Sequence, residues 1–240
     1  MALPKLQHPT SEVKIPSTKE KCIIRPYTVK EQKILLMLKE SSDSDEIVRT
    51  LKDLITSCCN TKINVEKLAY FDLEYLFLQI RAISVGEFSS LSYKCNNIVD
   101  DKRCGKVNQI DIDLTSISVD FSGVKPKEVQ IQQGISIRLN FPNVESAKHI
   151  LEYRESNNID SLIAAIINDV DVIKDSEKIY DDFTKEELAE FLYALPIEAF
   201  EKILEFYISC PTLKKVVNFV CSSCGYKEEI TLSGVQDFFE

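Results

Sequence analysis

The sequence predicts an α+β protein in which helical parts flank a small antiparallel β region. Three observations support this fold class. Apolar residues recur at helical spacing on both sides of the centre of the chain, and the central segment alternates apolar and polar residues as strands do. Two cysteine pairs also occur in similar surroundings, one near the centre and one near the C-terminus. A chain of 240 residues fits one large or two small domains.

These patterns divide the chain into five segments. They are an N-terminal β-hairpin arm at 1–26, an N-terminal helical part at 27–90, a first cysteine knuckle with β-hairpins at 91–142, a C-terminal helical part at 143–212, and a second cysteine knuckle with a C-terminal tail at 213–240.

The first two segments pass from short strands to long helices. Residues 12–15 and 21–25 have the pattern of two short strands around a turn. Thr28 and Glu31 have the spacing of a capping box, which predicts that a helix starts there. Two further helices are expected at about 45–58 and 68–86. The last of these is so apolar that it should be buried on most sides.

The second half begins with strands and continues with helices. Alternation predicts a strand at 110–114 and a hairpin formed by 129–132 and 135–139. Helical spacing then predicts helices at 145–155, 159–167, 185–194 and 197–209. The acidic stretch at 169–182 is interpreted as an exposed connection or one short strand. A cation site is less well supported there, because no glycine occupies the turn position of a calcium loop.

The two cysteine pairs share one local pattern: an aromatic residue, one spacer, a cysteine, a loop, then Cys-Gly and an alternating strand. The first runs from Tyr93 through Cys95 and Cys104, and the second runs from Phe219 through Cys221 and Cys224. The second pair has the usual spacing of a zinc half-site, whereas the loop of the first is longer than usual. We therefore predict a discontinuous zinc ribbon in which a structural Zn²⁺ is bound by Cys95, Cys104, Cys221 and Cys224.

Two alternatives to zinc stay open at this level: unrelated reduced thiol pairs, and two disulfides. If all four cysteines bind one ion, no coordination position is left for water or substrate, so a role in folding is expected and Lewis-acid catalysis is not. A metal-dependent hydrolase would require an open position. The other cysteines, Cys22, Cys58, Cys59 and Cys210, are interpreted as buried thiols of a protein in a reducing compartment.

Composition argues against several classes of function. The net charge of −9 disfavours nucleic acid as a partner, because nucleic-acid binders concentrate Lys and Arg. No apolar run is long enough to cross a membrane, and residues 1–10 do not have the pattern of a signal segment. The chain has six glycines and no Gly-rich phosphate loop, and neither His8 nor His149 has a nucleophile arranged beside it. We expect no catalytic residues, no small-molecule substrate and no enzymatic activity.

Several phrases, spread from the first residues to the last, carry a family resemblance. They are Met1–Lys5, Ile15–Thr18, Arg25–Tyr27 leading to Lys33–Leu36, the core-helix phrase Phe71–Arg81 with Ser84–Glu87, and Leu232–Phe239. Together they resemble the baseplate hub assembly proteins of T-even-type contractile-tailed bacteriophages. The core-helix phrase is the most specific part of the match.

The resemblance implies a hub subunit or an assembly chaperone that acts by protein–protein binding. Its partners would be other phage baseplate hub or tail proteins. It would act in the cytoplasm of the infected bacterial host or in the virion baseplate. The family supplies no catalytic residues. The rival interpretation of the cysteine pattern is a zinc-ribbon module that binds nucleic acid or associates with transcription.

Assembly by protein binding requires an accessible apolar surface, and the sequence offers two candidates. One is the C-terminal pair Phe238 and Phe239, which either packs against the core or binds a partner. The other is the apolar face of the last two helices, for which core packing is the favoured interpretation. Its residues are Phe191, Leu192, Phe200, Ile203, Leu204 and Phe206.

Overall fold

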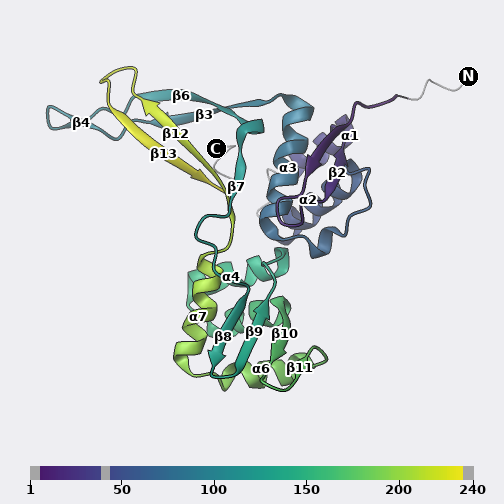
Figure 1. The fold of residues 1–240 in the computed structure, drawn as a ribbon. Coiled ribbons are helices and arrows are strands. Elements are labelled where there is room, and N and C mark those ends of the chain that lie inside the picture. Colours follow the sequence, from purple (N-terminus) through teal and green to yellow (C-terminus); the bar gives the residue numbers. More distant parts are fainter. Residues whose placement is uncertain (1–5, 39–43, 235–240) are drawn as a thin grey trace, which may run out of the picture. The chain divides into compact units, whose positions relative to one another are not determined.

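The structure, a computed structural model, describes residues 6–38 and 44–234 (Figure 1). In chain order its elements are β1 Ser11–Lys14, β2 Lys21–Ile24, α1 Val29–Leu38, α2 Ser44–Cys58, a 3₁₀ turn at Val65–Lys67, α3 Tyr70–Val85, β3 Phe88–Lys94, β4 Ile98–Val99, β5 Lys102–Arg103, β6 Val107–Asp113, a 3₁₀ turn at Leu114–Ser116, β7 Ser118–Asp120, β8 Glu128–Gln132, β9 Ile135–Leu139, α4 Val144–Ser156, α5 Ile159–Asp169, β10 Val170–Lys174, β11 Ile179–Tyr180, α6 Lys185–Tyr193, α7 Ile197–Ile208, β12 Thr212–Val220 and β13 Lys227–Ser233. The predicted combination of helices with small antiparallel sheets is confirmed.

Contacts within the chain group these elements into two compact units. Unit 1 comprises residues 1–65, 71–120 and 212–240, and unit 2 comprises 66–70 and 121–211. These units cut across the five segments into which the sequence pattern divides the chain. The long insertion of unit 2 starts and ends at one strand pair of unit 1, in which Asp120 of β7 lies opposite Thr212 of β12.

In unit 1, helix α3 is buried along most of its length, as its apolar sequence predicts. Its buried residues are Phe71, Asp72, Leu73, Glu74, Leu76, Leu78, Ile80 and Ala82. The carboxylate of Asp72, although fully buried, accepts hydrogen bonds from the backbone N–H and the hydroxyl of Ser17, in the turn between β1 and β2. These hydrogen bonds satisfy the buried carboxylate and connect the turn of the N-terminal arm to helix α3.

The start of α1 is fixed by one carboxylate that serves two purposes. Glu31 accepts a hydrogen bond from the backbone N–H of Thr28 at 2.6 Å, which is one of the two bonds of the predicted capping box, and the Thr28 hydroxyl donates to the same carboxylate at 3.0 Å. It also forms a two-pronged ion pair with Arg25, whose guanidinium nitrogens lie 2.7 and 3.1 Å from its oxygens. Mainly because of Arg25, the pKa of Glu31 is lowered to about 2.

The part of unit 1 that carries the two cysteine pairs contains two hairpins that pack face to face (Figure 1). Strands β3 and β6 pair antiparallel, with Leu91 opposite Ile110, and strands β12 and β13 pair antiparallel, with Val217 opposite Ile230. Alternating residues of both hairpins point into the space between them. The shared core contains Leu78, Ala82, Leu91, Ile112, Leu114, Ile117 and Leu213.

Unit 2 is a four-stranded antiparallel sheet in the order β11-β10-β9-β8, with helices on one face. The apolar side chains of the strands, such as Ile137 and Leu139, pack with Leu162, Ile166 and Phe206 of the helices. The opposite face is polar, and its side chains pair across the strands. There Lys174 lies 3.1 Å from Glu128, and Arg138 lies 3.4 Å from Asp171.

The interpretation of 169–182 as an exposed connection or a single strand was wrong. The segment contains two paired strands, β10 and β11, and β10 also pairs with β9 inside the sheet. The acidic residues concealed the strand pattern, because Asp171 is exposed on β10 and Asp175 lies in the turn between β10 and β11. Asp169, the first acid of the stretch, is 1% exposed and accepts hydrogen bonds from Ser146 at 2.5 Å and Tyr207 at 3.0 Å. Its burial raises its pKa to about 7.

The late helices use their apolar residues mainly inside unit 2. Leu192, Ile203 and Phe206 are buried, and Phe191, Phe200 and Leu204 pack against the same core. This face is therefore not an open docking surface, and core packing, the favoured interpretation, is confirmed. Phe238 and Phe239 lie outside the described residues. Among the helices that the structure describes, none combines the length and apolar character needed to cross a membrane.

Candidate metal centre

The first cysteine pair lies at the end of the β3–β6 hairpin. Cys95 follows β3 and Cys104 precedes β6, and between them the chain forms a small hairpin of strands β4 and β5. Asp100 and Asp101 take positive φ values of 49° and 60° at its tip, as a tight hairpin turn requires. The unusually long loop between these cysteines is therefore an extra hairpin, which returns the chain so that both thiols remain together.

The second pair lies in the turn between β12 and β13, and its backbone repeats the geometry of the first. In each turn the N–H of the first cysteine donates to the carbonyl of the residue after the glycine: Cys95 to Lys106 at 2.9 Å, and Cys221 to Tyr226 at 2.8 Å. In each, the glycine N–H donates back to the carbonyl of that cysteine, at 3.1 Å for Gly105 and 3.0 Å for Gly225.

Both glycines have positive φ, 63° and 72°, which explains why Cys-Gly occurs in both turns. The two cysteine pairs, which resemble each other in sequence, therefore also share the same backbone hydrogen bonds. Two knuckles of one design occur at the same end of the two packed hairpins.

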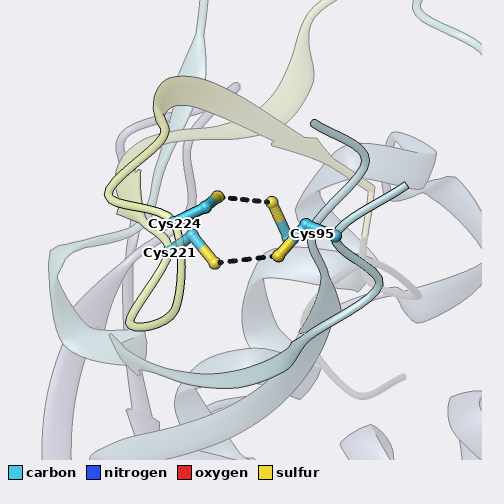
Figure 2. Close-up of side chains that lie close together, drawn as sticks. Cys95, Cys221 and Cys224 are labelled. Atoms are coloured by element: carbon cyan, nitrogen blue, oxygen red, sulfur yellow. Dashed lines mark hydrogen bonds between the residues drawn. The ribbon is translucent and has the colours of Figure 1, made fainter. Parts of the chain in front are cut away.

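The structure brings all four predicted cysteines together. Cys95 Sγ lies 3.7 Å from Cys224 Sγ, and Cys104 Sγ lies 3.8 Å from Cys221 Sγ, and all four sulfur atoms lie within 4.8 Å of one another. Figure 2 shows Cys221 and Cys224 facing Cys95 across the gap between the knuckles. These separations are far longer than the roughly 2.05 Å of a disulfide bond.

The spacing of the sulfur atoms fits a tetrahedral ion. Four sulfurs at about 2.3 Å from a central metal are about 3.8 Å apart along each edge of a regular tetrahedron. Two of the separations, 3.7 and 3.8 Å, match that edge, and all of them are within 4.8 Å. The cluster could therefore hold a metal ion, and a complete set of four thiolates would leave that ion no open position for water or a substrate.

The four thiols differ in their burial and in their pKa values. Cys95 and Cys221 are buried, whereas Cys104 and Cys224 are half-buried. Burial raises the pKa of Cys95 to about 12, and the backbone N–H of Cys224 is the main cause that lowers the pKa of Cys221 to about 6. A thiolate at Cys221 would provide the first anionic ligand, and a bound cation would favour loss of the remaining protons.

An aromatic pair covers the inner side of the cluster and joins the two hairpins. The rings of Tyr93 and Phe219, the aromatic residues that precede each knuckle, meet edge to face with centroids 4.7 Å apart. The hydroxyl of Tyr93 donates to Glu228 of β13 at 2.5 Å. The aromatic residue of the repeated pattern is thus part of the contact between the knuckles.

Two residues near the sulfurs were missed by sequence reasoning. Asn97 and Asn108 donate side-chain N–H groups to Cys224 and Cys221. One signal was available for Asn108, because it is a polar residue on the face of β6 that also presents the apolar Ile110 and Ile112. The signal for Asn97 was absent, since it lies in a loop whose hairpin was not anticipated.

Comparisons with known proteins place the chain at the level of a family. The model of the family described as T4 bacteriophage base plate protein matches residues 8–240, which is nearly the whole chain. No curated protein matches the chain, and no solved structure matches it. A match of this extent covers both compact units and both knuckles. The chain therefore belongs to the T4 bacteriophage base plate protein family.

Proposed function

We propose that this protein is a hub subunit or an assembly chaperone of a phage tail baseplate, and that it acts by binding other baseplate or tail proteins rather than by catalysis. The observation that carries the proposal is the family match over residues 8–240. The sequence phrases that resemble hub assembly proteins support the hub position in particular. On this proposal the protein acts in the cytoplasm of the infected host and, if it is a subunit, remains in the virion baseplate.

We also propose that the four-cysteine cluster is a zinc ribbon that holds one structural Zn²⁺. The close spacing of the sulfur atoms of Cys95, Cys104, Cys221 and Cys224 supports it, as does the repeated backbone geometry of the two knuckles. The ion would join residues that the chain separates by more than a hundred positions, with all of the inserted part of unit 2 between them. Its contribution would be to close unit 1.

The distribution of charge supports a protein partner rather than nucleic acid. Unit 2 contains 10 basic and 18 acidic residues, whereas unit 1, which carries the cysteine cluster, contains 19 basic and 20 acidic residues. Near the knuckles, Lys102 and Arg103 stand beside Asp100 and Asp101. A surface that neutralises phosphates would concentrate one sign of charge, and neither unit has an excess of positive charge.

Co-expression tests the partner. We expect the chain to co-purify with at least one other baseplate hub protein and to elute with it as one species of higher mass, at both low and high salt. Purified particles then distinguish the two roles: a hub subunit is found in finished tails, whereas a chaperone stays in the host extract. Strongly salt-dependent retention on DNA, with no association with tail proteins, would instead support the nucleic-acid module.

Metal analysis tests the zinc ribbon separately. We expect about one zinc ion per chain after expression in zinc-supplemented medium, and loss of that zinc in the double variant Cys221→Ser/Cys224→Ser. The matched control is Cys22→Ser/Cys58→Ser, which removes two other buried thiols of unit 1. A metal-free wild-type protein with four free thiols would reject the zinc ribbon and would leave the baseplate assignment intact.

A further inference from the structure

Asn108 makes four hydrogen bonds, three of which connect the first knuckle to the second. It lies on β6 in the first hairpin and is 9% exposed. Its side-chain oxygen accepts from the backbone N–H of Ser222 at 2.9 Å and from the Ser222 hydroxyl at 2.8 Å, both in the second knuckle. Its side-chain nitrogen donates to the carbonyl of Lys106 at 3.1 Å and to the sulfur of Cys221 at 3.8 Å.

The chemistry of the partners fixes the orientation of this amide. A backbone N–H can only donate, so the atom that faces Ser222 must be the oxygen of Asn108. A backbone carbonyl can only accept, so the atom that faces Lys106 must be the nitrogen. The N–H group is therefore directed at the Cys221 sulfur by bonds on both sides of the amide.

The other cysteine of the second knuckle receives a similar contact in the same direction, from the first hairpin to the second. Asn97, in the loop of the first knuckle, donates its side-chain N–H to the sulfur of Cys224 at 3.7 Å. Its own carbonyl accepts the backbone N–H of Cys104 at 2.8 Å, which holds the loop against the first knuckle. Each side-chain amide thus belongs to the first hairpin and donates to a cysteine of the second.

We propose that Asn108 and Asn97 are positioning residues of the metal centre, which orient Cys221 and Cys224 and stabilise their thiolates by N–H donation from the opposite hairpin. This inference rests on the proposed zinc ribbon. Both cysteines of the second knuckle receive such a bond, so these bonds hold the two hairpins in the arrangement in which all four sulfur atoms can bind one ion. Residues that hold metal ligands in this way typically change metal affinity by about 10- to 100-fold when they are replaced.

The sharpest test is Asn108→Asp, which has nearly the same shape. The aspartate keeps oxygen acceptors for Ser222 but presents an oxygen, instead of N–H, to the Cys221 sulfur. The matched control is Gln109→Glu, which adds the same charge at the neighbouring position of β6. Gln109 is exposed and bonds to Ser92, away from the sulfurs. A second control, Tyr93→Phe, removes the hydrogen bond to Glu228 between the hairpins without removing an N–H group from any sulfur.

Zinc affinity is measured by competition with a chromogenic chelator, and the site is monitored by the visible absorption of the Co²⁺-substituted protein. We expect Asn108→Asp and Asn97→Ala each to weaken zinc binding by about 10- to 100-fold and to shift the cobalt–thiolate bands. We expect Gln109→Glu and Tyr93→Phe to change the affinity by less than about 3-fold. Unchanged affinity in both Asn variants, or an equal loss in the two controls, would overturn the inference.

Two further measurements keep the outcomes distinct. Zinc content of the wild-type protein tests the metal centre itself, so a failure there is separate from a failure of the positioning role. Unfolding of each variant with zinc removed measures its purely structural cost. If Asn108→Asp fails to fold, Asn97→Ala decides the question, because Asn97 is only partly buried and lies in a loop. A loss of apo stability with zinc affinity retained would also overturn the inference.

Discussion

The sulfur of Cys95 lies 3.7 Å from the sulfur of Cys224, although 129 positions separate the two residues in the chain. No local preference of the sequence can produce this contact, because closing so long a loop costs conformational entropy that a weak thiol–thiol contact does not offset. The packing of the two hairpins and, on the proposed function, the binding of zinc stabilise it together. This contact and the shifted pKa values of Asp169 and Glu31 lead to four predictions.

Cys221→Ser should destabilise the protein far more than Cys210→Ser. The first change removes a proposed zinc ligand, and structural zinc supplies on the order of 10 kcal/mol in small isolated ribbons, so a loss of several kcal/mol is expected in this larger core. The second change affects a half-buried thiol that donates a hydrogen bond to the carbonyl of Phe206, and should cost about 1 kcal/mol. Denaturant unfolding with zinc present compares them, and equal midpoints would contradict the metal's role in folding.

Removing zinc with a chelator should loosen unit 1 and leave unit 2 unchanged. The cluster joins β3 and β6 to β12 and β13, all of which belong to unit 1, while the sheet of unit 2 has its own helix-covered core. Hydrogen exchange followed by mass spectrometry should show faster exchange in the two hairpins near the knuckles, and no change in β8, β9 and β10. Equal acceleration in both units would mean that the ion stabilises the whole chain as one cooperative body.

Asp169 should make unit 2 less stable as the pH rises from about 4 to 7. Its pKa is raised to about 7 in the folded protein, whereas an unfolded aspartate titrates near 4. In this window the folded state binds the proton and the unfolded state does not, so the free energy of unfolding falls with pH, by at most about 4 kcal/mol. Asp169→Asn should flatten this dependence, which urea unfolding at pH 5 and pH 8 would reveal. Parallel profiles for the two proteins would count against it.

Glu31 should give the opposite pH dependence to Asp169: its contribution to the free energy of unfolding should fall as the pH is lowered. Its folded pKa is about 2, below the ordinary value near 4.5, so its stabilising effect is complete above pH 4.5 and is lost as the pH falls towards 2. Glu31→Gln removes the ion pair with Arg25 and should cost about 1–2 kcal/mol at pH 7. Most of the difference from wild type should be lost by pH 2, and the rest should be lost below it. A difference of undiminished size at pH 2 would assign the effect to packing instead of charge.

Local patterns of the sequence predicted much of the fold. The helix at 185–193 begins at Thr184, whose hydroxyl and whose partner Glu187 form a capping box, and the hairpin at 128–139 turns at Gly134 with φ of 81°. Such signals depend on neighbouring residues, so they can be identified from the chain alone. The four cysteines could also be predicted, because each knuckle repeats the same short pattern.

Other features depend on contacts that no short pattern records. One short strand was an alternative for 169–182, but the place of 170–174 inside the sheet was not predicted, because it depends on pairing with β9, more than thirty positions earlier. The acidic residues also favoured a solvated loop. Asp169 was assigned to that loop, yet it is buried against Ser146 and Tyr207. The roles of Asn97 and Asn108 likewise emerge only when the second knuckle stands opposite the first.

The pairing of Asp120 with Thr212 gives the architecture an evolutionary and practical consequence. Residues 121–211 leave and re-enter at neighbouring positions of a single strand pair, in the manner of a greatly lengthened loop. Lengthening such a loop adds little free-energy cost, because closure entropy grows only with the logarithm of its length. Length can therefore be added within this insert, by a phage lineage or by an experimenter who grafts a tag or a reporter domain, without changing the path of the strands of unit 1 that carry it.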